Sequence, residues 1–235
     1  DHGAGQLLAR VIVNRLWQHH FGLGLVATPN DFGVQGAKPT HPELLDWLAA
    51  ELIRGGWRLK PIHQLIMTSR AYQQDTSADA AKQKADPANA LLARRTPRRL
   101  EAEAIRDSLL FVSGVLDTNM FGKPVPLARS QGRGQRVSMV LEPTHRPQDI
   151  GYTTRRTVYG LIDRADLPEV FNHFDFANPE MPSGRRYETT VPQQALYLMN
   201  SPLVVEQARN LVARPDFKAC STDADKLRRL YEILY

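Results

Sequence analysis

The sequence predicts a mainly α-helical fold, an irregular helical domain with a small β-hairpin in its middle. Apolar residues recur at the 3.6-residue spacing of amphipathic helices along most of the chain. Proline stands at the start and glycine at the end of several of these segments, as is usual for helices. Only two short runs are β-like, 136–141 and 157–162, and we expect them to pair as the hairpin.

The first helix is predicted over 6–21 and ends at a glycine. Its apolar side chains fall almost all round the helix axis, which is typical of a helix that is enclosed by protein. Asn14 and Arg15 lie within this apolar surface. Because buried polar groups need partners, we expect both to be buried and paired, Arg15 with a carboxylate such as Asp31 or Glu43.

The second helix follows a glycine-rich connection over 22–38. Its start, Thr40-His41-Pro42-Glu43, matches a capping box in which Thr40 is the N-cap and Glu43 reaches back to it. His41 has the same angular position around the helix axis as the apolar stripe of this helix, so we expect it to border the core. A half-buried structural histidine and a ligand or proton carrier are both open interpretations of that position.

The remaining elements follow in order. A third helix begins at Pro61, and the polar segment 75–92 is expected to be a solvated linker or a loose helix. A fourth helix is predicted over 97–116. The glycine- and proline-rich stretch 117–165 is expected to be a loop-rich insertion that contains the short hairpin. A polar loop over 175–190 precedes two final helices.

Composition limits the classes of protein. At 235 residues, with 42% hydrophobic and 23% charged residues, the chain is typical of a soluble globular domain, and we expect a single domain over 1–235. No apolar run approaches the about 18–20 residues that cross a bilayer. A single cysteine, Cys220, excludes an internal disulfide and an all-cysteine zinc site. The chain starts at Asp1 and stops within a helical pattern, so we expect a fragment of a larger multidomain protein.

Familiar chemical motifs are missing. The glycine pattern over 22–27 follows a helix rather than a strand, so no cofactor is expected there. No two histidines have the i,i+4 spacing of helical metal ligands, so no metal site is expected, and His63 is expected to face solvent. The net charge is +5, but the arginines are scattered rather than aligned on one element, which argues against nucleic acid as a partner.

The densest polar region lies between 155 and 190. Arginines next to acidic residues on loops can bind an anion or a sugar, or they can lock the loops in a salt-bridge network. Both interpretations are open, and a helix that starts near 190 slightly favours an anion because its first N–H groups are free. The candidate binding residues are Arg156, Arg185, Arg186 and Thr190.

Several long motifs occur in order along most of the chain. They are VNRLW at 13–17, NDFG at 30–33, THPELLDWL at 40–48, GWRLKPIH at 56–63 and TVPQQAL at 190–196. Together these motifs resemble the C-terminal domain of unknown function of planctomycete cytochrome-c-containing proteins.

The resemblance implies an exported, multidomain parent protein, periplasmic or at the cell surface, in which upstream domains of the same chain are the partners. Haem c is implied only for the upstream region, because the chain has no Cys-x-x-Cys-His motif. The resemblance transfers no catalytic residue. Four polar residues in the matching motifs or their helices are expected to be buried and structural: Asn14, Arg15, Gln194 and Asn200.

Three functions are therefore open. The first is an accessory or binding domain with an anionic or saccharide ligand, linked to the use of complex polysaccharides. The second is an enzyme, a hydrolase or a redox enzyme, whose site lies between the first helix and the 155–190 loops, with His41, Asp31 or Asp175 as proton carriers. The third is a purely structural or interaction domain.

Overall fold

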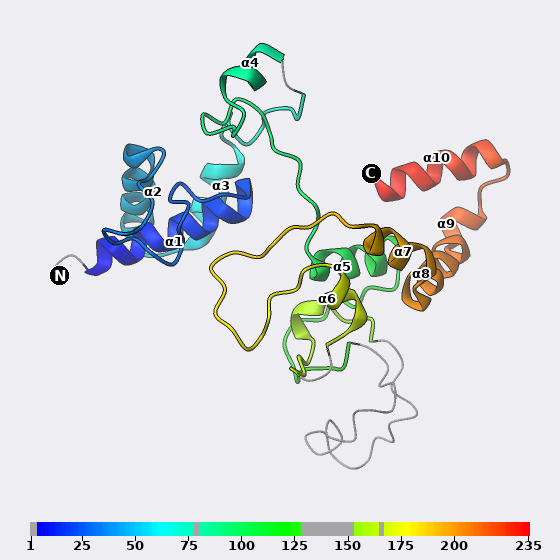
Figure 1. Ribbon diagram of the computed structural model, residues 1–235. Coiled ribbons are helices and arrows are strands. Elements are labelled where there is room, and N and C mark those ends of the chain that lie inside the picture. The colour runs from blue at the N-terminus through cyan, green and yellow to red at the C-terminus, as the bar shows by residue number, and fades with distance from the viewer. Residues whose placement is uncertain (1–3, 78–79, 128–152, 165–166) are drawn as a thin grey trace. The chain divides into compact units, whose positions relative to one another are not determined.

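The computed structural model describes residues 4–77, 80–127, 153–164 and 167–235, and these are mainly helical, as the sequence predicts (Figure 1). The chain divides into two compact units, Asp1–Arg99 and Leu100–Tyr235. The expectation of one domain over the whole chain stays a prediction. None of the helices in the described ranges is long and apolar enough to cross a membrane.

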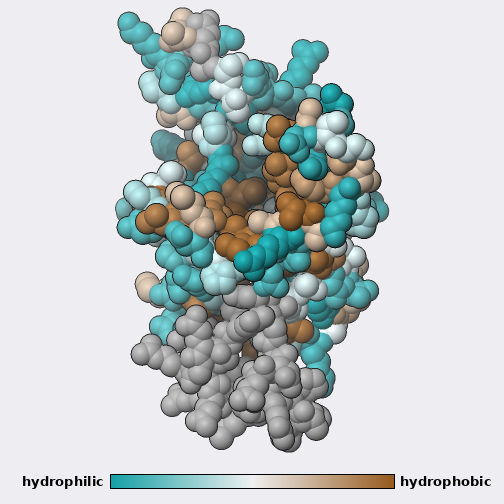
Figure 2. Space-filling model, turned by 90° about the vertical axis from the view of Figure 1, so that its right-hand side faces the viewer, coloured by the Kyte–Doolittle hydropathy of each residue, from teal (hydrophilic) through white to brown (hydrophobic). Residues whose placement is uncertain are grey.

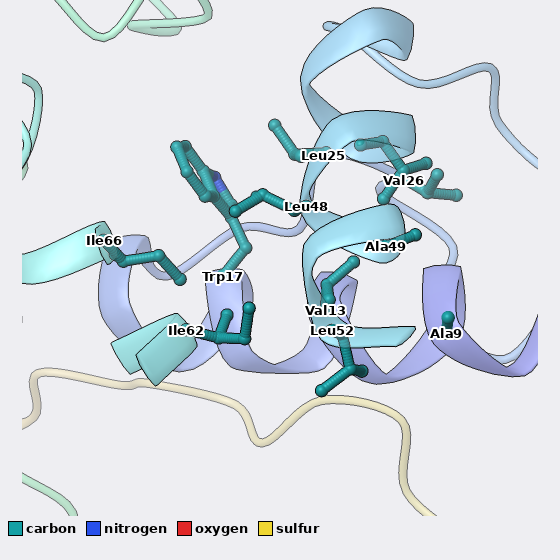
Figure 3. Packing of buried hydrophobic residues seen from close by; sticks show 11 residues of the cluster. Ala9, Val13, Trp17, Leu25, Val26, Leu48, Ala49, Leu52, Ile62 and Ile66 are labelled. Atoms are coloured by element: carbon teal, nitrogen blue, oxygen red, sulfur yellow. The ribbon is translucent and has the colours of Figure 1, made fainter. Parts of the chain in front are cut away.

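Unit 1 is built on three helices, α1 (Ala4–Phe21), α2 (Pro42–Arg54) and α3 (Leu59–Met67). Each helix buries residues spaced three or four apart, so that one stripe of each faces the shared core. Figure 3 shows side chains from all three helices and from the connection after α1 pointing toward one another. The buried core residues are Ala9, Val13, Trp17, Leu25, Val26, Leu45, Leu48, Ala49, Leu52, Ile62 and Ile66.

The connection between α1 and α2 is fixed at its ends. Gly22 ends α1 with φ at 91°, a conformation that suits glycine, and its N–H donates to the carbonyl of Gln18. The predicted capping box is wrong: His41 holds the N-cap position of α2, without a side-chain cap. Thr40 instead donates both its N–H and its hydroxyl to the carbonyl of Leu25, which ties the connection to the start of α2.

A short helix, α4 (Ala80–Ala85), lies within the segment 75–92 and buries none of its residues. This segment is held mainly by polar contacts of its own. The side chain of Asn89, which is buried, donates to the carbonyl of Arg94 at 2.7 Å, and the carboxylate of Asp86 accepts two backbone N–H bonds.

The described residues of unit 2 form α5 (Ala102–Val112), a 3₁₀ turn η3 (Thr157–Tyr159), and five further helices. These are α6 (Glu169–His173), α7 (Pro192–Asn200), α8 (Pro202–Ala213), α9 (Pro215–Lys218) and α10 (Asp223–Leu234). A second core lies where α5, α6 and α7 meet, and it is rich in aromatic side chains. Its buried members are Ala102, Leu127, Val170, Phe171, Phe174 and Tyr197.

The expected β-hairpin is not supported. Its first run, 136–141, lies outside the described residues. Its second run, 157–162, begins as the turn η3, because the N–H groups of Tyr159 and Gly160 bond back to carbonyls three residues earlier. Gly160 then makes only an isolated parallel bridge with Val125.

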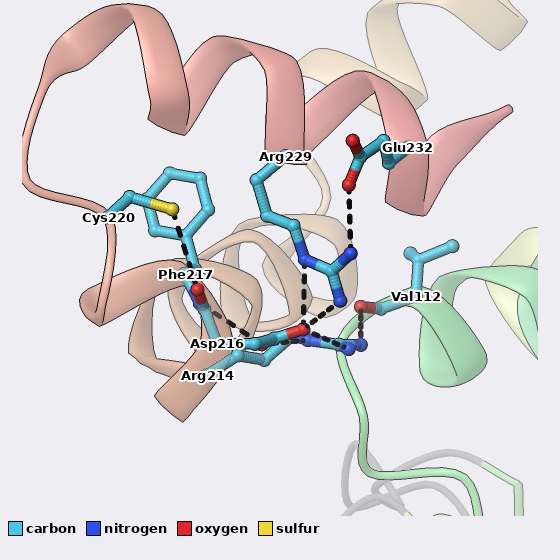
Figure 4. Close-up of polar contacts among 7 residues, drawn as sticks. All are labelled: Val112, Arg214, Asp216, Phe217, Cys220, Arg229 and Glu232. Carbon is cyan, nitrogen blue, oxygen red and sulfur yellow. Dashed lines mark hydrogen bonds and ion pairs between the residues drawn. The ribbon is translucent and has the colours of Figure 1, made fainter.

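The last helix, α10, is held by ion pairs rather than by burial. Asp216 on α9 accepts from Arg214 at 2.9 Å and from Arg229 of α10 at 2.6 Å (Figure 4). Arg214 also donates to the carbonyl of Val112 at the end of α5, at 2.8 Å. None of the residues of α10 is fully buried, and this cluster connects α10 to α9.

Candidate functional site

The polar loop between α6 and α7 is fastened to α5 by Arg186. Its guanidinium makes two parallel bonds to Glu103, at 2.6 and 2.8 Å, and a third to Glu101 at 3.1 Å. It also lies over the ring of Phe176, 5.1 Å from the ring centre. The bonds to Glu103 raise the pKa of Arg186 above its ordinary value, so the group stays charged.

The same loop is closed by Asp175 and Gln194. The carboxylate of Asp175, whose φ is 54°, accepts from the N–H of Thr189 at 2.8 Å and from its hydroxyl. Gln194 is buried at the start of α7 and donates to the carbonyls of His173 and Thr189, at 3.1 Å each. We call residues 175–191 the clamp loop, because contacts at both its ends fix its backbone.

Many side chains of the clamp loop are exposed, among them the acidic Glu180 and Glu188 and three that offer groups to an acidic ligand. Arg185 and Thr190 are exposed, and Tyr187 is 85% exposed. None of the described residues forms an ion pair with Arg185, whereas its neighbour Arg186 has two. Figure 2, which draws one face of the molecule, shows that apolar side chains also reach the surface among hydrophilic ones. The clamp loop therefore presents a cation, a ring and a hydroxyl from a fixed backbone.

A second polar cluster lies under η3. Arg106 is only 1% exposed and donates to the carbonyls of Thr153 and Arg155 and to the hydroxyl of Thr157. Burial lowers the pKa of Arg106, and the charge of Asp107 opposes this. Asp107 accepts from the N–H and the hydroxyl of Thr157, at 2.7 and 2.5 Å. This cluster holds η3 against α5.

Arg156, a predicted binding residue, is more exposed than this cluster. Its Nε lies 3.7 Å from a carboxylate oxygen of Asp107, and about half of its side chain is accessible. It is thus an ion-pair partner at the rim rather than a free cation.

Asp31 and His41, the candidate proton carriers of unit 1, have local partners. Asp31 is exposed and closes a turn, since its carboxylate accepts the N–H of Gly33 at 2.8 Å and its carbonyl accepts the hydroxyl of Thr28. His41 is half-buried, with Nδ1 3.0 Å from the hydroxyl of Thr40. Asp175 belongs to unit 2, and a catalytic role for any of the three stays a prediction.

Of the four residues expected to be buried, two are buried and two are exposed. Asn14 and Gln194 are buried and hydrogen-bonded. Arg15 and Asn200 are exposed, so the expectation of burial was wrong for both. For Arg15 the reason is that α1 packs against α2 and α3 on one side only, which leaves its other face open. The side-chain N–H of Asn200 donates to the carbonyl of Leu196 one turn earlier in α7.

Two features were not predicted. Arg106 is not among the residues singled out from the sequence, although it lies four residues from both Ala102 and Leu110, and both of these are buried. That spacing is the signal that could have found it. His63 was expected in solvent but is half-buried, with Nδ1 2.8 Å from Nε2 of His20. Nothing in the local sequence indicates the contact between His20 and His63, because the two residues are 43 positions apart.

Within the described ranges, no group of three or more histidine, cysteine or acidic side chains is arranged to hold a metal ion.

Comparison with known proteins places the chain in a family without assigning it an activity. No curated protein and no solved structure is significantly similar to it. A family model described as "PSD1: Protein of unknown function (DUF1553)" matches residues 2–235, and the chain therefore belongs to this family.

Proposed function

We propose that the chain is an accessory binding domain that recognises an acidic polysaccharide, within a larger exported, cytochrome-c-containing protein of planctomycetes. The ordered motifs along the chain support the parent protein, with haem c and the partner domains upstream. Membership of a family of unknown function agrees with a domain that has no assigned activity.

The observation that carries the binding proposal is the clamp loop. Arg186 and Asp175 use their charges to hold the loop, whereas Arg185, Tyr187 and Thr190 are left at the surface. A loop that is already fixed loses little conformational entropy when a ligand binds to it. The division between holding residues and exposed residues is what a recognition loop requires.

The exposed groups suit an acidic sugar chain. A guanidinium binds a carboxylate or a sulfate through two parallel N–H bonds. A phenol ring offers a flat apolar face together with a hydroxyl, which matches the mixed surface of a sugar ring.

The three carboxylates that hold the clamp loop are engaged in structural contacts. A general acid or base must reach the substrate with a free oxygen. Glu101 and Glu103 accept from Arg186, and Asp175 accepts from Thr189. These contacts favour the binding proposal. No observation on these residues supports the hydrolase or redox alternative.

The test is a binding titration of the full chain with three polymers: polygalacturonate, dextran sulfate and neutral dextran. We expect binding to one or both acidic polymers and a loss of about tenfold in affinity for Arg185→Ala, the size expected for one charge-assisted contact. Tyr187→Ala is expected to weaken binding as well.

Arg209→Ala is the matched control, because Arg209 is an exposed arginine of α8 in the same unit. It removes the same charge without touching the clamp loop. Equal losses for Arg185→Ala and Arg209→Ala would show that the polymer senses only net charge, and the proposal would then fail. Equal affinity for neutral dextran would also contradict it.

A further inference from the structure

His20 and His63 form an imidazole pair that joins α1 to α3. Nε2 of His20 lies 2.8 Å from Nδ1 of His63, and the ring centres are 5.1 Å apart. This centre-to-centre distance is the one that two imidazoles give when each points its nitrogen straight at the other. The contact is therefore an N–H···N hydrogen bond, and not two lone pairs that converge on a metal ion.

The pair sits among aromatic rings at one end of the unit 1 core. The edge of Tyr72 meets His20, with ring centres 5.4 Å apart and planes at 85°, and also meets Phe21. Phe21 in turn stacks on the core residue Trp17 at 4.2 Å. Opening the contact between the two histidines would thus disturb the packing of α3 and the following turn against α1.

Apart from the phenol of Tyr72, the groups that face the pair are arginines and histidines. The guanidinium of Arg95 lies 4.0 Å above the Tyr72 ring and donates to the Tyr72 carbonyl, and Arg98 donates to the carbonyl of His19. Burial lowers the pKa of His20, and the charges of His63, Arg95 and His19 lower it further. Among the described residues, no carboxylate contributes to this shift.

We propose that His20 and His63 form a pH-sensitive latch that holds α3 to α1 at neutral pH and releases it in mildly acidic solution. The neutral pair keeps its hydrogen bond, since one nitrogen donates and the other accepts. A first added proton also leaves the bond intact, and the C-terminal end of α1 tolerates that charge. A second proton turns both facing nitrogens into donors, so the bond breaks and two imidazoliums face each other.

The sign of the effect follows from proton linkage. An imidazole that is freed from the contact has the ordinary histidine pKa of about 6.5, and the opened state can bind one proton more than the hydrogen-bonded pair. The latch is therefore fully effective above this pH and weakens as the pH falls below it. For a difference of one proton, the ratio of opened to closed molecules rises about tenfold for each pH unit.

Amide hydrogen exchange of the full chain between pH 7.5 and pH 5.0 tests the latch, with rates corrected for intrinsic exchange. We expect the protection of the peptide over Leu59–Met67 to fall about tenfold per pH unit below about pH 6.5. His20→Gln should abolish this slope, because the glutamine amide can replace Nε2 in the hydrogen bond but does not titrate. His63→Asn is the second variant, since its amide can replace Nδ1.

His19→Gln is the matched control: it removes the exposed neighbouring histidine of the same helix and should leave the slope unchanged. Two results would overturn the latch. One is the same slope in wild type and in either pair variant. The other is an NMR titration in which both imidazoles are charged at pH 5.0 while α3 keeps its full protection.

Discussion

Asn14 is the polar residue on which the connection after α1 depends. It is fully buried, and its amide makes two bonds to one residue: Oδ1 accepts the N–H of Val26 at 2.8 Å, and Nδ2 donates to the Val26 carbonyl at 3.1 Å. Val26 is itself 2% exposed, so neither of its backbone groups has solvent as an alternative. Asn14 thus makes with Val26 the two backbone hydrogen bonds that a neighbouring β-strand would otherwise make.

Asn14→Leu keeps the number and branching of the side-chain heavy atoms and removes both bonds. Two buried backbone groups then lose their partners, at about 1–3 kcal/mol each, which gives a loss of about 2–6 kcal/mol. A unit of this size is stable by about 5–15 kcal/mol. The substitution should therefore move the urea midpoint of unit 1 down by about 1 M or more.

Tryptophan fluorescence during urea unfolding measures this change in unit 1 alone, because Trp17, Trp47 and Trp57 are the only tryptophans of the chain. Asn30→Ala, at an exposed position of the same connection, is the control and should leave the midpoint unchanged. If Asn14→Leu unfolds at the wild-type urea concentration, the two hydrogen bonds contribute no net stability and the reasoning fails.

Two further perturbations test unit 2. Arg186→Ala should speed limited proteolysis within 177–190, at a stability cost of about 1 kcal/mol for a partly exposed ion pair. Arg186→Lys should restore only part of the protection, because lysine cannot make two parallel bonds. Cleavage of Arg186→Ala at the wild-type rate would contradict the role of Arg186 in holding the clamp loop. The bonds from Arg214 and Arg229 lower the pKa of Asp216, so its contribution is present above the ordinary value of 3.8 and is lost only as the pH falls through the lower folded value. Hydrogen exchange over Asp223–Leu234 should therefore stay slow at pH 4 in the wild type but be fast at every pH in Asp216→Asn; equal rates in the two proteins would mean that other contacts hold α10.

The helices and the stripes they bury could be predicted because both depend on spacing along the chain. Leu45, Leu48 and Leu52 share a face in any helix, whatever covers it, and the structure buries all three. The capping box shows the limit of this reasoning. The residues match the capping-box pattern, but the hydroxyl of Thr40 donates to the Leu25 carbonyl, a partner that only the folded connection brings within reach.

The candidate site was predictable in composition but not in the roles of its members. The run that contains Arg185 and Arg186 could be identified as a polar, cationic loop, yet the two arginines are indistinguishable in sequence. One is paired to Glu101 and Glu103 from α5, and the other is left at the surface. Which of two adjacent charges becomes structural depends on where distant carboxylates lie.

The sequence by itself determined the helical class, the faces that are apolar and the residue types available for chemistry, because these follow from local periodicity and composition. The tertiary structure decided which of those faces are covered. It left Arg15 in solvent, buried Arg106 under η3, and brought His20 against His63. Burial and pairing arise from contacts between segments that are far apart in the chain, and no local pattern records those contacts.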